Sequence, residues 1–250
     1  MKICVPMTGS DPAVLEAEAL EIRRANCDLA EWRADCFDGT LADGAEALTP
    51  LLASIKAALG PIPLIFTFRT AEEGGRRAIG ETAYQTLLLT AARSGLADII
   101  DLEFFRIGSK KAGIADEAGL ARLIAEIRLA GAMVLLSSHD FERTPPESEL
   151  ENRLRRMEHL GADIVKLAVM PRCRADVAAL LRVTERIKAA GCRAGLITIS
   201  MGDLGKESRL AGGPLGTDVT FGTLGQASAP GQLSVPEIRA ALAERDRRAK

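Results

Sequence analysis

The chain has 250 residues, of which 47% are hydrophobic, and a formal net charge of −2 at pH 7. This length supplies a large core, and the absence of a global basic field argues against binding to nucleic acid or to a membrane surface. The apolar runs fall short of the ~20 residues of a membrane span, and the N-terminal MKICVPMTG lacks the apolar region of a signal peptide. The five cysteines show no CxxC spacing, which argues against a zinc site or a disulfide framework and favours a reducing, cytoplasmic compartment.

Strand-like and helix-like segments alternate along the chain. The expected strands are 2–7, 29–35, 63–69, 97–103, 133–140, 163–169, 193–200 and 218–222. The expected helices lie at about 12–26, 44–58, 80–94, 114–130, 147–160, 174–190, 204–211 (a short turn) and 235–246. Eight such units at this length predict one (β/α)8 TIM barrel domain over residues 1–250, rather than an open doubly wound sheet. No GxGxxG fingerprint follows the first strand, which weakens the dinucleotide-binding alternative.

Five consecutive strands, from the second to the sixth, carry polar side chains on one face. Under the strand period of two, Glu31 and Arg33 alternate with apolar Trp32. The same alternation assigns these residues to the polar faces of the following strands: Arg69, Asp101, Glu103, Ser137, His139 and Lys166. If the apolar faces meet the helices, the polar side chains point into the barrel near its C-terminal mouth, where barrel enzymes carry out catalysis. Because unpaired buried charges are costly, this convergence predicts an active site.

Lys166 lies in the apolar stretch GADIVKLAV, residues 161–169. Apolar strand neighbours and nearby cations are expected to disfavour its ammonium form, and a neutral buried amine can form a Schiff base with a carbonyl substrate. His139, one strand earlier, is suited to moving protons near neutral pH. The other histidine, His159 in RRMEHLG, is expected at a solvated helix end. The residues alone leave two hypotheses open: an imine-forming barrel enzyme, such as a class I aldolase, and a barrel that binds a metabolite without catalysis.

Several segments, taken in order, resemble the type I 3-dehydroquinate dehydratases of the shikimate pathway over nearly the whole chain. They are EWRAD (31–35), FTFRTAEEGG (66–75), SSHDFERTP (137–145), DIVKLAVMP (163–171), SMGDLGKESRLAG (200–212), VTFG (219–222) and SAPGQ (228–232). The resemblance implies a (β/α)8 barrel, commonly a homodimer, that works without metal or organic cofactor. It also implies a hydro-lyase that converts the small molecule 3-dehydroquinate to 3-dehydroshikimate by syn elimination of water.

The resemblance also implies roles for individual residues. Lys166 matches the Schiff-base lysine, His139 the proton shuttle, and Glu73 the carboxylate that orients this histidine. The residues that match the substrate-binding set are Glu31, Arg33, Arg69, Met201, Arg209, Phe221, Ser228 and Gln232. The planar guanidinium of Arg209 can donate two parallel hydrogen bonds to a carboxylate. Acidic positions matching Asp35, Asp101 and Glu103 are expected to support the site by pairing with its cations.

Two features of the sequence depart from the family pattern, and a third leaves the class I aldolase hypothesis open. The chain begins at its first strand, so the segment that covers the barrel floor in some members is expected to be missing. Pro6 stands where some relatives have a hydroxyl residue near the substrate. The glycines of SRLAGGPLGTDVTFG, residues 208–222, leave room for the phosphate that a typical aldolase binds at its last two strands, whereas the resemblance favours a carboxylate.

Overall fold

The computed structural model describes residues 1–39, 41, 45–105, 108–109, 114–211, 216–225 and 229–248. Its strands are β1 (Lys2–Met7), β2 (Leu29–Arg33), β3 (Leu64–Thr67), β4 (Ile99–Glu103), β5 (Gly108–Ser109), β6 (Ile114–Ala115), β7 (Met133–Asp140), β8 (Ile164–Val169), β9 (Gly195–Ser200), β10 (Val219–Thr223) and β11 (Leu233–Ser234). Its α-helices are α1 (Pro12–Arg24), α2 (Ala45–Leu59), α3 (Glu81–Arg93), α4 (Glu117–Leu129), α5 (Glu147–His159), α6 (Arg174–Ala189) and α7 (Val235–Arg248). Three 3-10 segments, η1 (Ala34–Cys36), η2 (Ala71–Glu73) and η3 (Asp203–Leu210), follow β2, β3 and β9.

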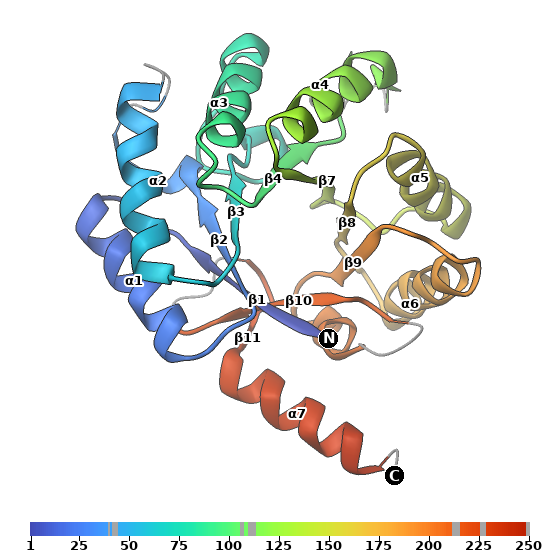
Figure 1. Cartoon of the computed structure of the whole chain (residues 1–250). Coiled ribbons are helices and arrows are strands. Elements are labelled where there is room, and N and C mark those ends of the chain that lie inside the picture. The colour runs from blue at the N-terminus through green and yellow to red at the C-terminus, as the bar shows by residue number, and fades with distance from the viewer. Residues whose placement is uncertain are drawn as a thin grey trace.

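The strands form a parallel ring that the helices surround (Figure 1). Within the described residues, the sheet order is β11-β10-β1-β2-β3-β4-β7-β8-β9. The ring closes between β9 and β10, where the amide of Asp218 donates to the carbonyl of Leu196 at 2.7 Å. The predicted (β/α)8 architecture is confirmed, and η3 occupies the place of the short seventh helix. The sequence reading did not include β11, which pairs with β10, or the short antiparallel pair β5–β6.

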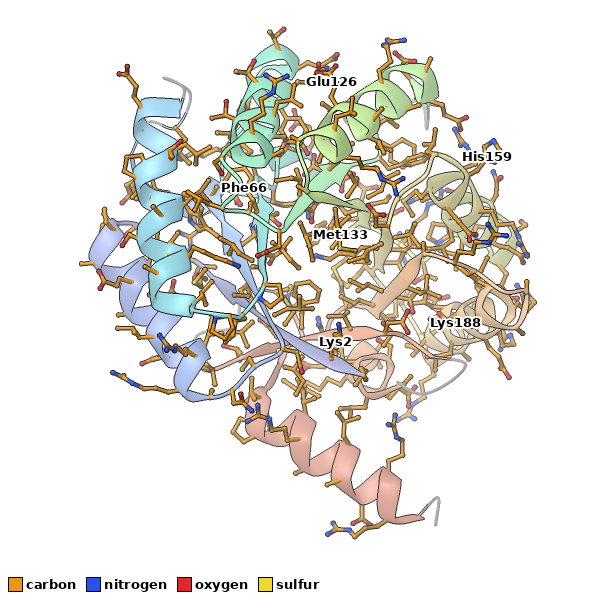
Figure 2. All side chains as sticks on the ribbon, in the orientation of Figure 1. Lys2, Phe66, Glu126, Met133, His159 and Lys188 are labelled. Carbon is orange, nitrogen blue, oxygen red and sulfur yellow. The ribbon has the colours of Figure 1, made fainter. Side chains whose placement is uncertain are left out.

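Two apolar cores confirm the predicted alternation of the strands. The outward face of β2 and β3, with Trp32 and Phe66, packs in the core between the ring and its helices. Figure 2 shows Phe66 on this outer side, toward α2 and α3. The inward face carries a separate core inside the ring that includes Ile65, Leu135 and Ile197. Alternate residues therefore serve different cores, as the strand period requires.

Glycines end several helices just before the next strand. Gly95 and Gly161 have φ of 67° and 88°, in the left-handed region where glycine carries no Cβ penalty. The chain can therefore turn sharply into β4 and β8. None of the described helices is long and apolar enough to cross a membrane.

A repeated carboxylate clamp ties neighbouring strands together at the N-terminal end of the ring. An aspartate just before a strand accepts the backbone N–H at or near the start of the preceding strand in the ring. The pairs are Asp28 with Ile3, Asp98 with Leu64, Asp163 with Val134, and Asp218 with Leu196, at 2.7–2.9 Å. Cations also pair with three of these carboxylates: Lys56 with Asp98, Arg128 with Asp163, and Lys188 with Asp218. These charge-assisted bonds help to hold neighbouring strands together at this end of the ring.

Candidate active site

A pocket opens at the C-terminal ends of the strands, the end that sequence analysis marked as the mouth of the barrel. Its volume of about 150 Å³ is several times the roughly 30 Å³ of one water molecule, so it can hold a small metabolite. Its lining includes every proposed site residue except Ser228: Glu31, Arg33, Arg69, Glu73, His139, Lys166, Met201, Arg209, Phe221 and Gln232. Ser228 lies outside the described residues. The sequence-predicted side chains thus come together from strands and loops far apart in the chain.

His139 and Glu73 form a buried hydrogen-bonded pair at one side of the pocket. Glu73 Oε2 lies 2.9 Å from His139 Nδ1 and also accepts the backbone N–H of His139 at 3.0 Å. A carboxylate at Nδ1 holds the ring orientation and favours the imidazolium form. Nε2, on the opposite side of the ring, is then the nitrogen that can exchange a proton with a ligand. The second histidine lies elsewhere: Figure 2 shows His159 at the outer edge of the molecule, beside α5.

Lys166 rises from β8 into the pocket and is 6% exposed. Its Nζ lies 3.6 Å from Glu31 Oε1 and 4.1 Å from the centroid of the Phe221 ring. The hydroxyl of Thr67 donates to the same Glu31 oxygen at 3.0 Å. The sequence reading emphasised nearby cations, whereas the immediate neighbours of Nζ are an anion and a π face that both stabilise an ammonium group.

Arg69 is locked by acidic neighbours beneath the pocket. Its NH2 donates to Asp101 Oδ2 at 2.6 Å and its NH1 to Glu103 Oε1 at 2.9 Å, while NH1 lies 3.8 Å from Glu73. Ser137 Oγ accepts from NH1 and donates to Asp101. Burial alone would lower the pKa of Arg69, but the surrounding carboxylates, Asp101 first, raise it well above its usual value. The guanidinium is therefore a fixed positive charge that offsets the buried carboxylates.

Arg33 makes a bidentate pair with Asp35 at the rim of the pocket. Nε and NH2 of Arg33 each lie 2.8 Å from one carboxylate oxygen. Burial is the largest single influence and opposes ionisation of both groups, but the mutual hydrogen bonds and opposite charges, with backbone N–H bonds to Asp35, together outweigh it. The pKa of Arg33 is therefore raised and that of Asp35 is lowered. Both groups are charged at neutral pH.

Arg209 differs from the other two arginines because no described acidic side chain pairs with it. It is 2% exposed, its NH2 donates to the carbonyl of Pro230 at 2.9 Å, and its buried Nε has no hydrogen-bond partner. Burial lowers the pKa of Arg209 to about 10. A buried guanidinium with unmet hydrogen-bonding capacity is a site for an anionic ligand group.

Some pocket residues were missed by sequence reasoning. Phe141 stacks near the His139 ring, with centroids 6.3 Å apart and planes at 19°, and Ala168, Ile199 and Pro230 also line the pocket. The period of two could have found Phe141, which follows His139 by two residues, and Ala168, which follows Lys166 by two. Within the described ranges, no group of three or more histidine, cysteine, aspartate or glutamate side chains could hold a metal ion.

The arrangement brings a buried lysine, a hydrogen-bonded histidine–glutamate pair and an arginine with no described acidic partner into one cavity. Comparison with known proteins gives a consistent assignment. The sequence model of the family described as type I 3-dehydroquinase matches residues 3–248. A 3-dehydroquinate dehydratase from Klebsiella pneumoniae (strain 342) is 42% identical over 237 residues, covering 95% of this chain and 90% of the relative.

Solved structures of 3-dehydroquinate dehydratases are also similar to this chain over nearly its whole length. A 3-dehydroquinate dehydratase from Geobacillus kaustophilus HTA426 superposes with a TM-score of 0.89 at 34% identity, covering 100% of this chain and 92% of the other. A type I 3-dehydroquinate dehydratase from Clostridium difficile, solved with covalently modified comenic acid, gives a TM-score of 0.90 at 34% identity, with coverages of 99% and 93%.

Proposed function

The chain belongs to the type I 3-dehydroquinase family and is a hydro-lyase, and we propose that it removes water from 3-dehydroquinate through an imine formed at Lys166. The product of this dehydration is 3-dehydroshikimate, and the reaction is a step of the shikimate pathway. The observation that carries the proposal is the placement of a buried lysine and the His139–Glu73 pair around one small pocket. The family resemblance also predicts a homodimer, which analytical ultracentrifugation can test.

The reaction begins when the Lys166 ammonium gives up a proton to His139. The neutral amine attacks the C3 carbonyl, and His139 returns the proton to the hydroxyl of the resulting carbinolamine, which leaves as water and gives a protonated imine. The iminium withdraws electrons and acidifies the C2–H bond. His139 then takes the C2 proton, the C1–O bond breaks, and His139 returns a proton to the departing hydroxyl, so that water leaves from the same face. Hydrolysis of the imine releases the product and regenerates the lysine.

Glu73 supports this sequence because its carboxylate stabilises the imidazolium that forms when His139 accepts the C2 proton. Arg209 is proposed to bind the carboxylate of the substrate, since that anion satisfies the guanidinium and compensates its burial. Glu31, 3.6 Å from Lys166, and Gln232 are proposed to contact the hydroxyl groups of the substrate. Arg33 is proposed to bind substrate at the rim, and Met201 and Phe221 to form the apolar walls.

The solved relative from Clostridium difficile, which contains covalently modified comenic acid, is in keeping with covalent chemistry in such a pocket. The direct test is to incubate the enzyme with 3-dehydroquinate, reduce with sodium borohydride, and map the modified peptide by mass spectrometry. We expect turnover in the untreated sample and a stable adduct on Lys166 after reduction.

The Lys166→Ala variant is expected to lose both the adduct and turnover while keeping its fold by circular dichroism. Lys188→Ala is a matched control, because Lys188 pairs with Asp218 at the opposite end of the barrel, and it should retain both. Substantial kcat in Lys166→Ala, or an adduct on another lysine, would contradict the covalent mechanism.

A further inference from the structure

The segment that carries Glu73 is a tight loop of residues 69–77 between β3 and α3, here called the Glu73 loop. It contains the 3-10 turn η2 and closes on itself, since the amide of Ala71 donates to the carbonyl of Arg77 at 2.9 Å. Gly75 packs directly on Arg69, and a Cβ at this position would lie 1.9 Å from the Arg69 carbonyl oxygen. These contacts make the loop compact, so the position of its two ends determines where Glu73 lies relative to His139.

Asp35 accepts hydrogen bonds from both ends of the Glu73 loop. Its Oδ1 accepts the backbone N–H of Arg69 at 3.2 Å, and its Oδ2 accepts the backbone N–H of Arg76 at 3.0 Å. The same two oxygens accept Nε and NH2 of Arg33, each at 2.8 Å. The Asp35 side chain is completely buried. Four N–H donors from two chain segments thus converge on one carboxylate. Asp35 itself does not line the pocket.

A second buried carboxylate holds the interior of the loop. Glu103 accepts the backbone N–H of Thr70 at 2.9 Å through Oε1 and the hydroxyl of Thr70 at 2.7 Å through Oε2. Among the described residues, Glu103 makes no hydrogen bond or ion pair with Arg33, so it holds the loop independently of the rim of the pocket. Asp35 is the group that joins the loop to Arg33.

We infer that Asp35 is a positioning residue that couples substrate binding at Arg33 to the alignment of the Glu73–His139 pair. The inference rests on the function proposed above. When Arg33 binds an anionic or hydroxyl group, its guanidinium stays aligned only while Asp35 holds it, and the same carboxylate keeps the loop ends fixed. A shift of Asp35 therefore disturbs both substrate binding and proton transfer, because misplacing a catalytic group by ~1 Å can cost ~10²-fold in rate.

The geometry predicts why a neutral replacement fails. A carboxylate offers two acceptor oxygens to the four donors, whereas the amide of asparagine offers one oxygen and turns an NH2 group toward the remaining donors. In Asp35→Asn one loop end and one arm of the guanidinium therefore lose their acceptor. The substitution keeps the shape of the side chain and changes none of the residues that line the pocket, so its effect on catalysis reports on how those residues are positioned.

The experiment compares three variants of the full chain. In Asp35→Asn we expect kcat to fall on the order of 10²-fold and KM for 3-dehydroquinate to rise, with faster amide exchange in peptides covering residues 69–77. In Arg33→Gln the Asp35 bonds to both loop ends remain but a proposed substrate-binding group is lost, so KM should rise, while kcat falls less and loop exchange increases less than in Asp35→Asn. Asp163→Asn is the matched control, because Asp163 also joins an arginine and a backbone N–H, but at the far end of the barrel. It should keep kcat and KM.

If Asp35→Asn does not fold, Asp35→Glu provides the same test, since it keeps the charge but displaces the carboxylate by one methylene. Unchanged loop exchange, or a raised KM with the kcat of the control, would overturn the inference. Hydrogen exchange does not depend on turnover. A parent enzyme inactive on 3-dehydroquinate would refute the proposed function, while loop exchange would still report on the structural coupling.

Discussion

Arg209 and Arg33 lie at the same pocket, yet their removal should change stability in opposite directions. Arg209 has no described acidic partner, and burial lowers its pKa from the usual value of arginine to about 10. At 1.36 kcal/mol per pKa unit, this corresponds to a penalty of about 3 kcal/mol on the charged form in the free enzyme. In Arg209→Leu this penalty disappears. Loss of the hydrogen bond to Pro230 costs about 1 kcal/mol, and poorer packing offsets part of the remainder.

We therefore expect Arg209→Leu to raise the free energy of unfolding by about 1–2 kcal/mol, and Tm by about 2–8 °C for a chain of this size. The same substitution should weaken substrate binding by about 3 kcal/mol, because it removes charge-assisted bonds to the carboxylate, so KM rises roughly a hundredfold. Differential scanning calorimetry measures the first effect and steady-state kinetics with 3-dehydroquinate the second.

Arg33→Leu is the matched control for the sign of the stability change. It leaves the fully buried Asp35 without the bidentate partner that holds it at 2.8 Å, and breaking a buried pair in this way costs about 3 kcal/mol. Its Tm should fall. Saturating 3-dehydroshikimate should raise the Tm of the parent enzyme more than that of Arg209→Leu. A Tm for Arg209→Leu that falls as far as that of Arg33→Leu, with KM unchanged, would refute the reasoning about an unpaired guanidinium.

Further predictions concern the acid–base pair, the barrel clamps and the pH dependence of stability. His139→Gln should lower kcat by ~10²–10⁴-fold in the steady-state assay, toward the upper end because His139 serves several steps; near-normal turnover would exclude it as the proton shuttle. Glu73→Gln should lower kcat less than His139→Gln, since it weakens the imidazolium without removing the base, and an equal loss would argue against this division of roles. Asp163→Ala should cost about 1.5–3 kcal/mol of unfolding free energy in urea titrations, with kcat unchanged. Because the folded-state pKa of Asp35 is lowered, its contribution to stability is present above about pH 4 and is lost as the pH falls through the folded pKa; Asp35→Asn should flatten the acid limb of the Tm–pH curve, and an unaltered limb would contradict this.

The sequence determined the architecture because the relevant signals are local. Alternating apolar residues in β2, β3, β7 and β8 divide between the two cores as predicted. The order of strand-like and helix-like segments led to the barrel, and barrel topology then required the C-terminal strand ends to meet. The placement of Lys166 and His139 in one pocket follows from that topology and a period of two.

The family resemblance extended the reading to loop residues that the period of two does not reach. Glu73, Arg209 and Gln232 were identified through their motifs, and the structure places all three at the pocket. Strand boundaries were less exact: the predicted strand 29–35 ends at Arg33, where the chain enters η1. That early turn sets Asp35 between Arg33 and the Glu73 loop.

Only the tertiary structure decided how the charges are paired. The resemblance predicted that Asp35, Asp101 and Glu103 pair with cations of the site, and the structure shows which cation each one holds. Arg33 pairs with Asp35, Arg69 pairs with Asp101 and Glu103, and Arg209 pairs with none of the described acids. The sequence likewise did not indicate that Glu31 and Phe221, rather than cations, are the nearest neighbours of the Lys166 ammonium. Pairing depends on distances of a few ångströms between side chains on different elements, and those distances are fixed only when the ring closes and the loops pack across its mouth.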